Sequence, residues 1–501
     1  MPTLLPNSSC KTPSSPHGRK LVKSLVIALS VSAFILPAPA YAFDFKAVLQ
    51  AMKSDVEAKG GTMSFGTVEA NGVDNGRVRD LVIIDGRNSG ELRFEELAVS
   101  GIITQSENDY AFDTLNATGI EILARQSNET EISIAEFSAR DVDLPPFNEK
   151  TEAGKDIFWP FTIASSEIKG FSLTNSEGQK SLAYTSPSIS LKELNIRGDA
   201  NFSLGALSVA GGNGSIQNPS GENGSYEVGA LSLARLDFKD QTSFGLGSFL
   251  MEPIYYAGTD KAERPIDIKI GTIDINEVHA LNVDGDGRFP FPSEDMRFSM
   301  DGFSMDIEQK PAVVMGALTS NAKYDEEVEE LLFDTKLASL FADLDNIPPT
   351  KDNRIALKQL RELGYNDIDL AVELKGSWDT LSGEMNIPLY RIALANMGAF
   401  SMGMSLEGYT MDFVKRLQAI TKRIGLTKDP EIVRAMNIQM MALFSELALK
   451  DMSLSVEDDS LTQRVIKQQA EKTGQSSQDL MAALPFLTGA ALAPLQAPEF
   501  A

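Results

Sequence analysis

Asn282, Asp284 and Asp286 place three oxygen-bearing side chains at alternate positions, which is the spacing of the first calcium ligands in an EF-hand loop. Such a loop also needs a bidentate glutamate at its twelfth position, and here that position is Ser293. No pattern of flanking helices accompanies the segment, and its Gly-Asp-Gly string is typical of a hairpin turn. We therefore favour a turn and keep a weak calcium site at these three residues as the alternative.

His279 is the one histidine beyond residue 42, so a Ser-His-Asp hydrolase would need it as the general base. Ile273 and Ile275 alternate just before it, which favours a polar residue of a strand or turn. Ser166 and Lys169 have the Ser-x-x-Lys spacing of penicillin-recognising enzymes, but the residues around them are typical of a strand, not of the required helix. We predict no catalytic residue, no cofactor and no enzymatic activity.

Residues 1–42 have the three parts of a Sec-type export signal. A basic segment precedes an uncharged apolar run over 25–36, and the small residues Ala40 and Ala42 then form a signal-peptidase site. The apolar run is shorter than the ~20 residues that span a bilayer. We expect cleavage between Ala42 and Phe43, a periplasmic mature protein and no transmembrane segment after cleavage.

The composition excludes several kinds of site. Cys10 is the only cysteine and is removed with the signal, which excludes disulfides and thiolate-bound metals from the mature chain. The signal carries four basic residues and no acid, so its loss lowers the net charge from −25 to −29. An acidic surface is repelled by nucleic acid, which we do not expect as a partner. The 43% hydrophobic content indicates a folded protein.

A short pattern recurs along the chain: apolar-x-x-apolar-x-apolar-x-Gly/Asp. The clearest copies begin at Phe65, Phe94, Phe112, Ile134 and Leu191, with degenerate copies from 163, 228, 270 and 300 and a late copy from 444. The last apolar positions alternate as in a half-buried strand, and the Gly or Asp predicts a turn. The first apolar residue has the wrong parity, which one extra residue in a β-bulge would correct.

The pattern predicts a mainly β, α+β protein: a long curved antiparallel sheet of bulged strands with amphipathic helices packed on it. The spacing of apolar residues predicts helices over 44–59, 325–345 and 411–441. The expected regions are an N-terminal helix and β repeats over 43–320, a helical segment over 321–365, a second β region over 366–456 with the helical insertion 411–441, and a helical tail over 457–501.

Over roughly residues 60–320 and 366–456, these repeated strands resemble the AsmA-like and YdgA-like β-repeat envelope proteins of Gram-negative bacteria. The resemblance implies a β groove with an apolar interior that binds lipid, and a role in maintaining the cell envelope. The function expected is thus non-enzymatic binding of lipid or another hydrophobic ligand. The alternative is a scaffold or assembly factor that binds other envelope proteins. A carrier would show an apolar face larger than a closed core needs, whereas helices would cover a scaffold's sheet.

Overall fold

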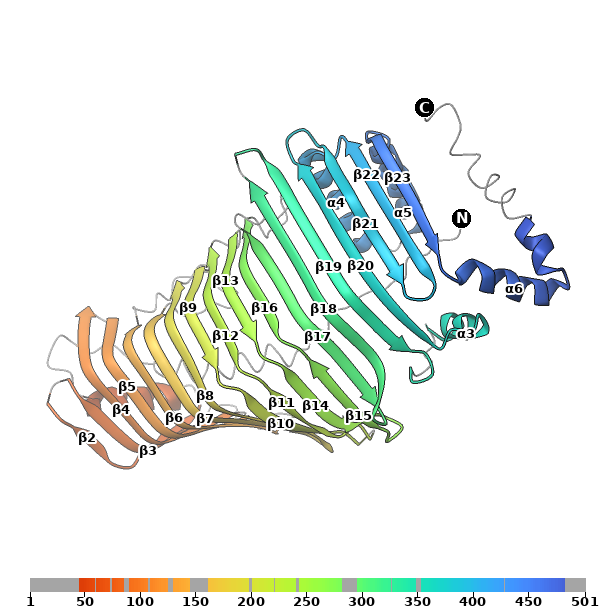
Figure 1. Ribbon diagram of the computed structural model, residues 1–501. Coiled ribbons are helices and arrows are strands. Elements are labelled where there is room, and N and C mark those ends of the chain that lie inside the picture. Colours follow the sequence, from red (N-terminus) through yellow and green to blue (C-terminus); the bar gives the residue numbers. More distant parts are fainter. Residues whose placement is uncertain are drawn as a thin grey trace. The chain divides into compact units, whose positions relative to one another are not determined.

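The computed structural model of the chain describes residues 45–482, apart from short gaps at 59, 73, 85–89, 107–108, 125–128, 145–160, 198–200, 220, 240–242, 282–294, 326, 348–352 and 428. The predicted signal and the cleavage site at Ala42 and Phe43 lie outside the described residues. Among those described, 23 strands pair antiparallel, and a few helices accompany them. The predicted mainly β, antiparallel class is confirmed (Figure 1).

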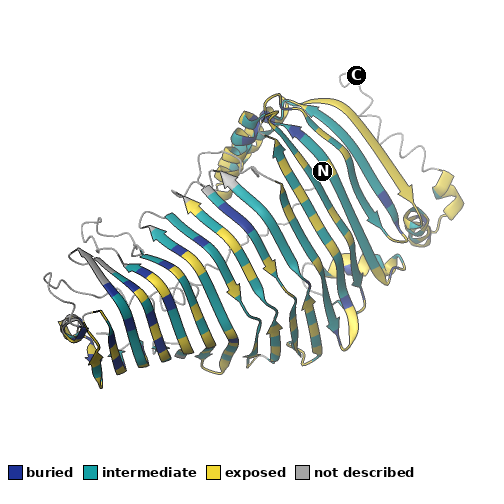
Figure 2. Ribbon diagram, turned by 60° about the vertical axis from the view of Figure 1, so that its left-hand side comes forward, coloured by how far each residue is buried: buried dark blue, intermediate teal, exposed yellow. Residues whose placement is uncertain are grey.

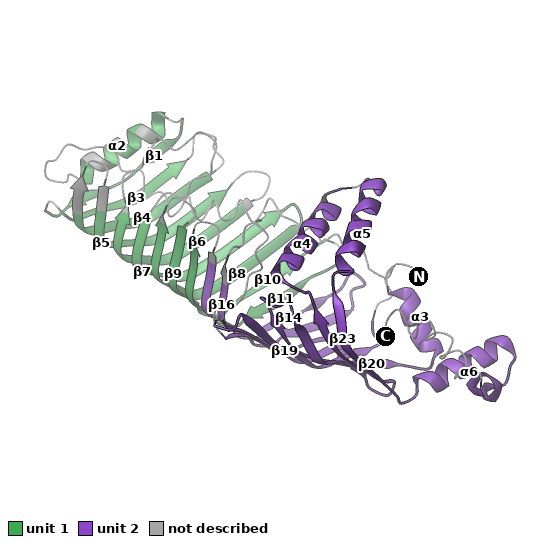
Figure 3. Cartoon of the chain, turned by 90° about the horizontal axis from the view of Figure 1, so that it is seen from above, with its two compact units in different colours: residues 1–241 green, residues 242–501 purple. Residues whose placement is uncertain are grey.

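The chain divides into two compact units, residues 1–241 and 242–501 (Figure 3). Unit 1 contains these elements: α2 (Phe45–Ala58), β1 (Thr62–Ser64), β2 (Val68–Ala70), β3 (Gly76–Ile84), β4 (Gly90–Ser106), β5 (Asp109–Ala124), β6 (Glu129–Leu144), β7 (Phe161–Glu177), β8 (Lys180–Arg197), β9 (Asn201–Val209), β10 (Gly212–Gln217), β11 (Gly224–Val228) and β12 (Leu231–Lys239).

Helix α2 is the amphipathic helix predicted over 44–59. Its buried residues Phe45, Leu49 and Met52 join the apolar cluster of the sheet. The Phe45 ring lies on Gly76 of β3, where a Cβ atom would be 2.2 Å from the ring carbon Cγ. Glycine at position 76 therefore makes room for the helix.

Two rows of kinks cross the sheet of unit 1. Along each row the ladder skips one residue per strand, or two where β4 pairs with β5 in the first row, and the register is the same on both sides of the gap. The first row consists of Asp80, Glu95, Gly119, Ala135, Gly170 and Pro187. The second row consists of Gly101, Asp113, Asp141, Ala164, Glu193, Gly205 and Arg235. In both rows every second residue has a left-handed φ, between 48° and 63°.

These kinks explain the recurring sequence pattern. In β5, Asp113 and Gly119 are the second and eighth positions of one copy, and both are kink residues. The apolar residues of this copy, Phe112, Leu115 and Ala117, are all buried, although the first two are three residues apart and the last two are two residues apart. The predicted change of parity is present here. The change arises because neighbouring strands have kinks at matching positions, so that all of them change parity together. It does not come from one extra residue in a single strand.

One predicted copy is displaced and another is not a strand throughout. In β8 the kink residues are Pro187 and Glu193, so the copy there begins at Ser186 and not at Leu191. The late copy begins at Phe444, which is the last residue of a helix. Register shifts of the bulge type do occur in unit 2, for example between Ser405 and Leu406.

Unit 2 is a second run of antiparallel strands accompanied by helices. Its elements are β13 (Ser243–Met251), β14 (Ile254–Thr259), β15 (Pro265–Ile270), β16 (Ile273–Leu281), β17 (Met296–Ile307), β18 (Lys310–Asp325), β19 (Glu330–Asp343), α3 (Arg354–Glu362), β20 (Asp367–Asp379), β21 (Met385–Leu394), β22 (Gly398–Glu407), α4 (Met411–Leu426), α5 (Pro430–Phe444), β23 (Ala448–Asp458) and α6 (Leu461–Thr473).

The helix predicted over 325–345 is wrong. Residues 330–343 form β19, which pairs with β18 on one side and β20 on the other. Within the predicted helical segment 321–365, only α3 is helical among the described residues. Two ladders of backbone hydrogen bonds and the cross-strand side-chain pairs outweigh the helical spacing of the leucines, because tertiary pairing overrides local propensity. The predicted insertion over 411–441 is confirmed as the α4–α5 hairpin.

Candidate ligand-binding face

Strands β20 to β23 separate apolar and polar side chains between the two faces of their sheet. In β20, Val372 and Leu374 point to one face, and Glu373 and Lys375 point to the other, because successive side chains of a strand alternate. The register carries this division across the neighbouring strands. We call the apolar side the open face, and its residues are Leu370, Val372, Leu374, Tyr390, Ile392, Phe400, Met402, Met404, Met452, Leu454 and Val456.

The open face becomes more exposed toward β23. Its residues on β20, β21 and β22 are half-buried. On β23, Met452, Leu454 and Val456 are 51%, 54% and 70% exposed, and the strand is exposed along its whole length (Figure 2). A contiguous group of large, exposed apolar side chains often marks a surface that binds a ligand or a partner.

Packed clusters close the two ends of the open face. At one end, Trp378 packs with Phe413 and Val414 of α4 and Leu443 of α5. At the other end, Leu344 packs with Leu357 of α3. The open-face residues named above belong to neither cluster. The described residues therefore leave an apolar strip between two covered ends.

The polar side of the same strands holds the edge of the sheet in place. Arg391 on β21 makes a bidentate ion pair with Glu457 on β23, with N–O distances of 3.0 and 2.9 Å, and donates to Ser401 on β22. The hydrogen bonds from Arg391 lower the pKa of the Glu457 carboxyl. These contacts hold β21, β22 and β23 together. On the opposite, apolar side of these strands, no buried cluster of the described residues covers the open face.

Methionine is concentrated in this region. Nine of the 18 methionines lie between residues 385 and 452. Met402 and Met404 lie on the open face, and Met436 and Met440 lie nearby in sequence on α5. Methionine side chains are flexible and polarizable, so such a surface can adapt to apolar ligands of different shape.

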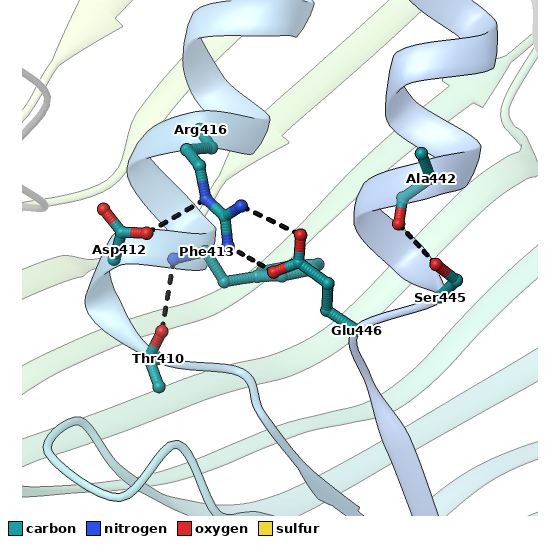
Figure 4. A network of polar contacts seen from close by, with 7 residues as sticks. All are labelled: Thr410, Asp412, Phe413, Arg416, Ala442, Ser445 and Glu446. Carbon is teal, nitrogen blue, oxygen red and sulfur yellow. Dashed lines mark hydrogen bonds and ion pairs between the residues drawn. The ribbon is translucent and has the colours of Figure 1, made fainter.

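A polar network fixes the base of the α4–α5 hairpin (Figure 4). The Arg416 guanidinium of α4 pairs with both oxygens of Glu446, which follows α5, and with Asp412 at 3.0 Å. Its hydrogen bonds lower the pKa of the Glu446 carboxyl. Thr410 caps α4 by accepting from the Phe413 backbone N–H.

The indole of Trp378 joins this hairpin to the sheet. Its Nε1 donates to the backbone oxygen of Tyr409 at 2.6 Å, and the two rings meet edge to face with centroids 5.3 Å apart. Tyr409 leads directly into α4. The hairpin is thus positioned from β20.

The candidate catalytic residues lie on strands of the two units. His279 lies in β16 opposite Gly245, as the strand pattern predicted, and its Nε2 is 3.4 Å from Glu277. Ser166 and Lys169 lie in β7. Glu136 accepts from Lys169 at 3.2 Å and raises the pKa of its ammonium group, the opposite of what a lysine base or nucleophile needs.

The candidate calcium ligands Asn282, Asp284 and Asp286 lie outside the described residues. Within the described part of the chain, no group of three or more histidine, cysteine or acidic residues could hold a metal ion. A shallow hollow at β17, β18 and β19 is lined by both acids and bases, including Asp295, Arg297, Lys323 and Asp334. Lys323 and Asp295 pair there at 3.5 Å.

The sequence contained a signal for the open face that the repeat pattern did not use. Residues 400–406 alternate Phe, Met, Met and Leu with Ser and Gly, and residues 452–456 alternate Met, Leu and Val with Ser. This alternation predicts strands with one apolar face. Which apolar faces would remain uncovered depends on contacts between distant segments, and alternation does not show that.

A family model described as "Uncharacterized protein" matches residues 391–501, which include β22, β23 and the α4–α5 hairpin. No curated protein and no solved structure matches the chain. No helix in the described part is both long enough and apolar enough to cross a bilayer.

Proposed function

We propose that this chain is an exported, non-enzymatic protein of the bacterial cell envelope that binds lipid or another hydrophobic ligand on the open face. The observation that carries the proposal is the apolar strip on β20 to β23, with exposures that rise to 70% at Val456. Burying a large aliphatic or aromatic side chain contributes roughly 1.5–3 kcal/mol. A ligand that covers the strip gains part of this free energy at each side chain that it buries, most of all on β23, where the side chains are the most exposed.

Unit 1 supports the same proposal from its own strands. Most of the fully buried residues of its cluster lie on β3 to β6, whereas on β7 to β12 residues such as Phe171, Leu191, Phe202 and Leu233 are only partly buried. An apolar face that continues past its packed core offers further surface for an acyl chain. The predicted export signal places the protein in the periplasm, where such ligands occur in the envelope.

The scaffold alternative has less support. Strand β23 pairs with β22 alone among the described strands, so a partner protein could add a strand at its other edge. Lys450, Asp451, Glu457 and Asp458 all lie on β23. Charged side chains on an edge strand oppose the addition of another strand. The geometry favours a ligand on the face over a strand at the edge.

Binding of a fluorescent long-chain fatty acid by the mature chain tests the proposal. Leu454→Asp puts a charge on the open face at an exposed position, and it should weaken probe binding about tenfold or more without lowering the melting temperature. Ser455→Asp adds the same charge one residue away, on the polar face, and is the matched control. The proposal fails if neither the wild type nor the control binds the probe, or if both variants bind it equally well.

A further inference from the structure

The α4–α5 hairpin, residues 411–444, differs in charge from the rest of the molecule. The chain has a net charge of −25, yet the hairpin contains six basic residues and three acids. Arg416 is held in the network at the base. The other described cations, Lys415, Lys422, Arg423 and Arg434, have no ion-pair partner within 4.0 Å among the described residues.

Of these cations, Lys422 is directed away from the packed side of α4. Phe413, Val414, Leu417 and Ile420 pack in the cluster around Trp378. Lys422 lies on the opposite side, because it is about half a turn away from Leu417 and Ile420 in a helix of 3.6 residues per turn. Lys422, Arg423 and Arg434 are all exposed.

Helix α5 also has exposed apolar residues that its packing does not explain. Leu443 is buried against the base, whereas Ile432, Ile438 and Met441 are 44%, 64% and 69% exposed. Ile438 and Met441 are three residues apart and so share one side of the helix. Exposed cations beside exposed apolar side chains are the signature of a helix that lies at a lipid–water interface.

The hairpin projects from the sheet of unit 2 (Figure 3). The packed residues of α4 run from Phe413 to Ile420, and the helix, with 16 residues, is about 24 Å long. The Debye length at physiological salt is about 8 Å. Lys422 lies roughly 15 Å along the helix axis from Asp412, so the charge of the acids at the base of α4 is largely screened near Lys422 and Arg423.

We propose that the α4–α5 hairpin is a docking element for a bilayer with anionic headgroups. Lys422, Arg423 and Arg434 pair with headgroups, and Ile438 and Met441 enter the acyl boundary. An anionic surface is the partner that fits, because it complements both the local positive charge and the exposed apolar side chains. This inference does not rest on ligand binding by the open face, which uses other residues.

Vesicle flotation with the full mature chain tests this inference. The protein should float with equimolar phosphatidylglycerol and phosphatidylcholine and stay in solution with phosphatidylcholine alone. Each lysine or arginine near an anionic surface contributes about fivefold in affinity, which is roughly 1 kcal/mol. The double variant Lys422→Gln/Arg423→Gln should therefore bind about tenfold more weakly or worse, and so should Ile438→Ser/Met441→Ser.

Matched controls make the same chemical changes elsewhere. Lys180→Gln/Lys467→Gln removes two exposed cations, and Ile355→Ser/Leu381→Ser removes two apolar side chains that are 67% and 74% exposed. Both controls should bind as the wild type does. Equal binding to neutral vesicles, no binding, or equal losses in variants and controls would overturn the proposal. Binding of the hairpin to an acidic protein without binding to vesicles would also overturn it.

The fatty-acid probe distinguishes this proposal from the ligand proposal. The hairpin variants should bind the probe in solution as the wild type does. Loss of vesicle binding with probe binding intact supports the docking element. Loss of both in the hairpin variants would show that the hairpin has no separate role.

Discussion

Glu446 shows how a single exposed ion pair can hold an element in place. The carboxylate accepts two hydrogen bonds from the Arg416 guanidinium and connects the end of α5 to the second turn of α4. Bidentate pairs of this kind fix geometry as well as charge. The pair lies beside the cluster around Trp378, so its loss loosens the attachment of the hairpin.

The lowered pKa of Glu446 gives this pair a pH dependence. A carboxyl whose pKa is lower in the folded state contributes stability above its unfolded pKa, about 4.3, and loses it as the pH falls through the folded value. Glu446→Gln should be less stable than the wild type at neutral pH. The difference should shrink as the pH falls below about 4. Urea unfolding followed across this range measures it.

Glu471→Gln is the control for this titration. Glu471 is exposed on α6 and pairs with no cation among the described residues. Its substitution should leave stability unchanged at every pH. A pH-independent loss in Glu446→Gln would show that the residue acts by packing and not through its charge.

At the level of single residues, some features were predicted correctly from the sequence. The apolar residues of β5 were assigned to one buried face, and Phe112, Leu115 and Ala117 are buried. The strand setting of His279 was also predicted. The left-handed backbone at Asp141 was not, because an aspartate fits a turn as well as a kink inside a strand.

At the scale of the element, the kink rows depend on a close approach between neighbouring strands. Gly119 has a φ of +56°, and a Cβ atom there would lie 2.2 Å from Cγ of Glu95 on β4. Glycine at this position meets two separate requirements, one of the backbone and one of the neighbouring side chain. The two can be measured separately.

Gly119→Ala should cost about 2–4 kcal/mol, because about 1–2 kcal/mol of left-handed strain adds to the overlap with Glu95. Gly178→Ala has a similar φ, +62°, but no atom within 4 Å of the added carbon, so it should show the strain alone. Chemical denaturation of both variants compares them.

The second half of this test is a double variant. Glu95 is exposed, so Glu95→Ala alone should change stability little. In the Gly119→Ala background it should recover the part of the loss that comes from overlap. Additive losses would mean that Glu95 moves aside freely, and that the kink row does not depend on this contact.

Elements were predicted unevenly, and the reason is physical. The helix over 44–59 was predicted correctly because its apolar residues recur with the helical period and so form one stripe on its surface. Residues 330–343 carry leucines that fit a helix equally well, but in the structure they lie between β18 and β20. Whether such a segment forms a helix or a strand depends on strands that are distant in sequence. A local pattern of apolar residues carries no information about those strands.

At the scale of the whole molecule, the predicted export signal can be tested directly. Intact-mass measurement of the protein from the envelope fraction should give an N-terminus at Phe43. A retained apolar segment over 25–36 would instead make the protein membrane-anchored. Replacing Ala42 with a large residue such as Trp should block cleavage, because the signal site requires small side chains.

The alternation within the kink rows restricts how a chain of this kind can change its length. In each row a left-handed residue on one strand faces an ordinary residue on the next, as Asp80 faces Glu95 and Glu95 faces Gly119. Inserting or deleting one strand would place either two left-handed or two ordinary residues side by side. Inserting or deleting a hairpin of two strands keeps the alternation. The alternation therefore favours changes of length by pairs of strands, which would enlarge the apolar face while leaving the neighbouring kinks matched.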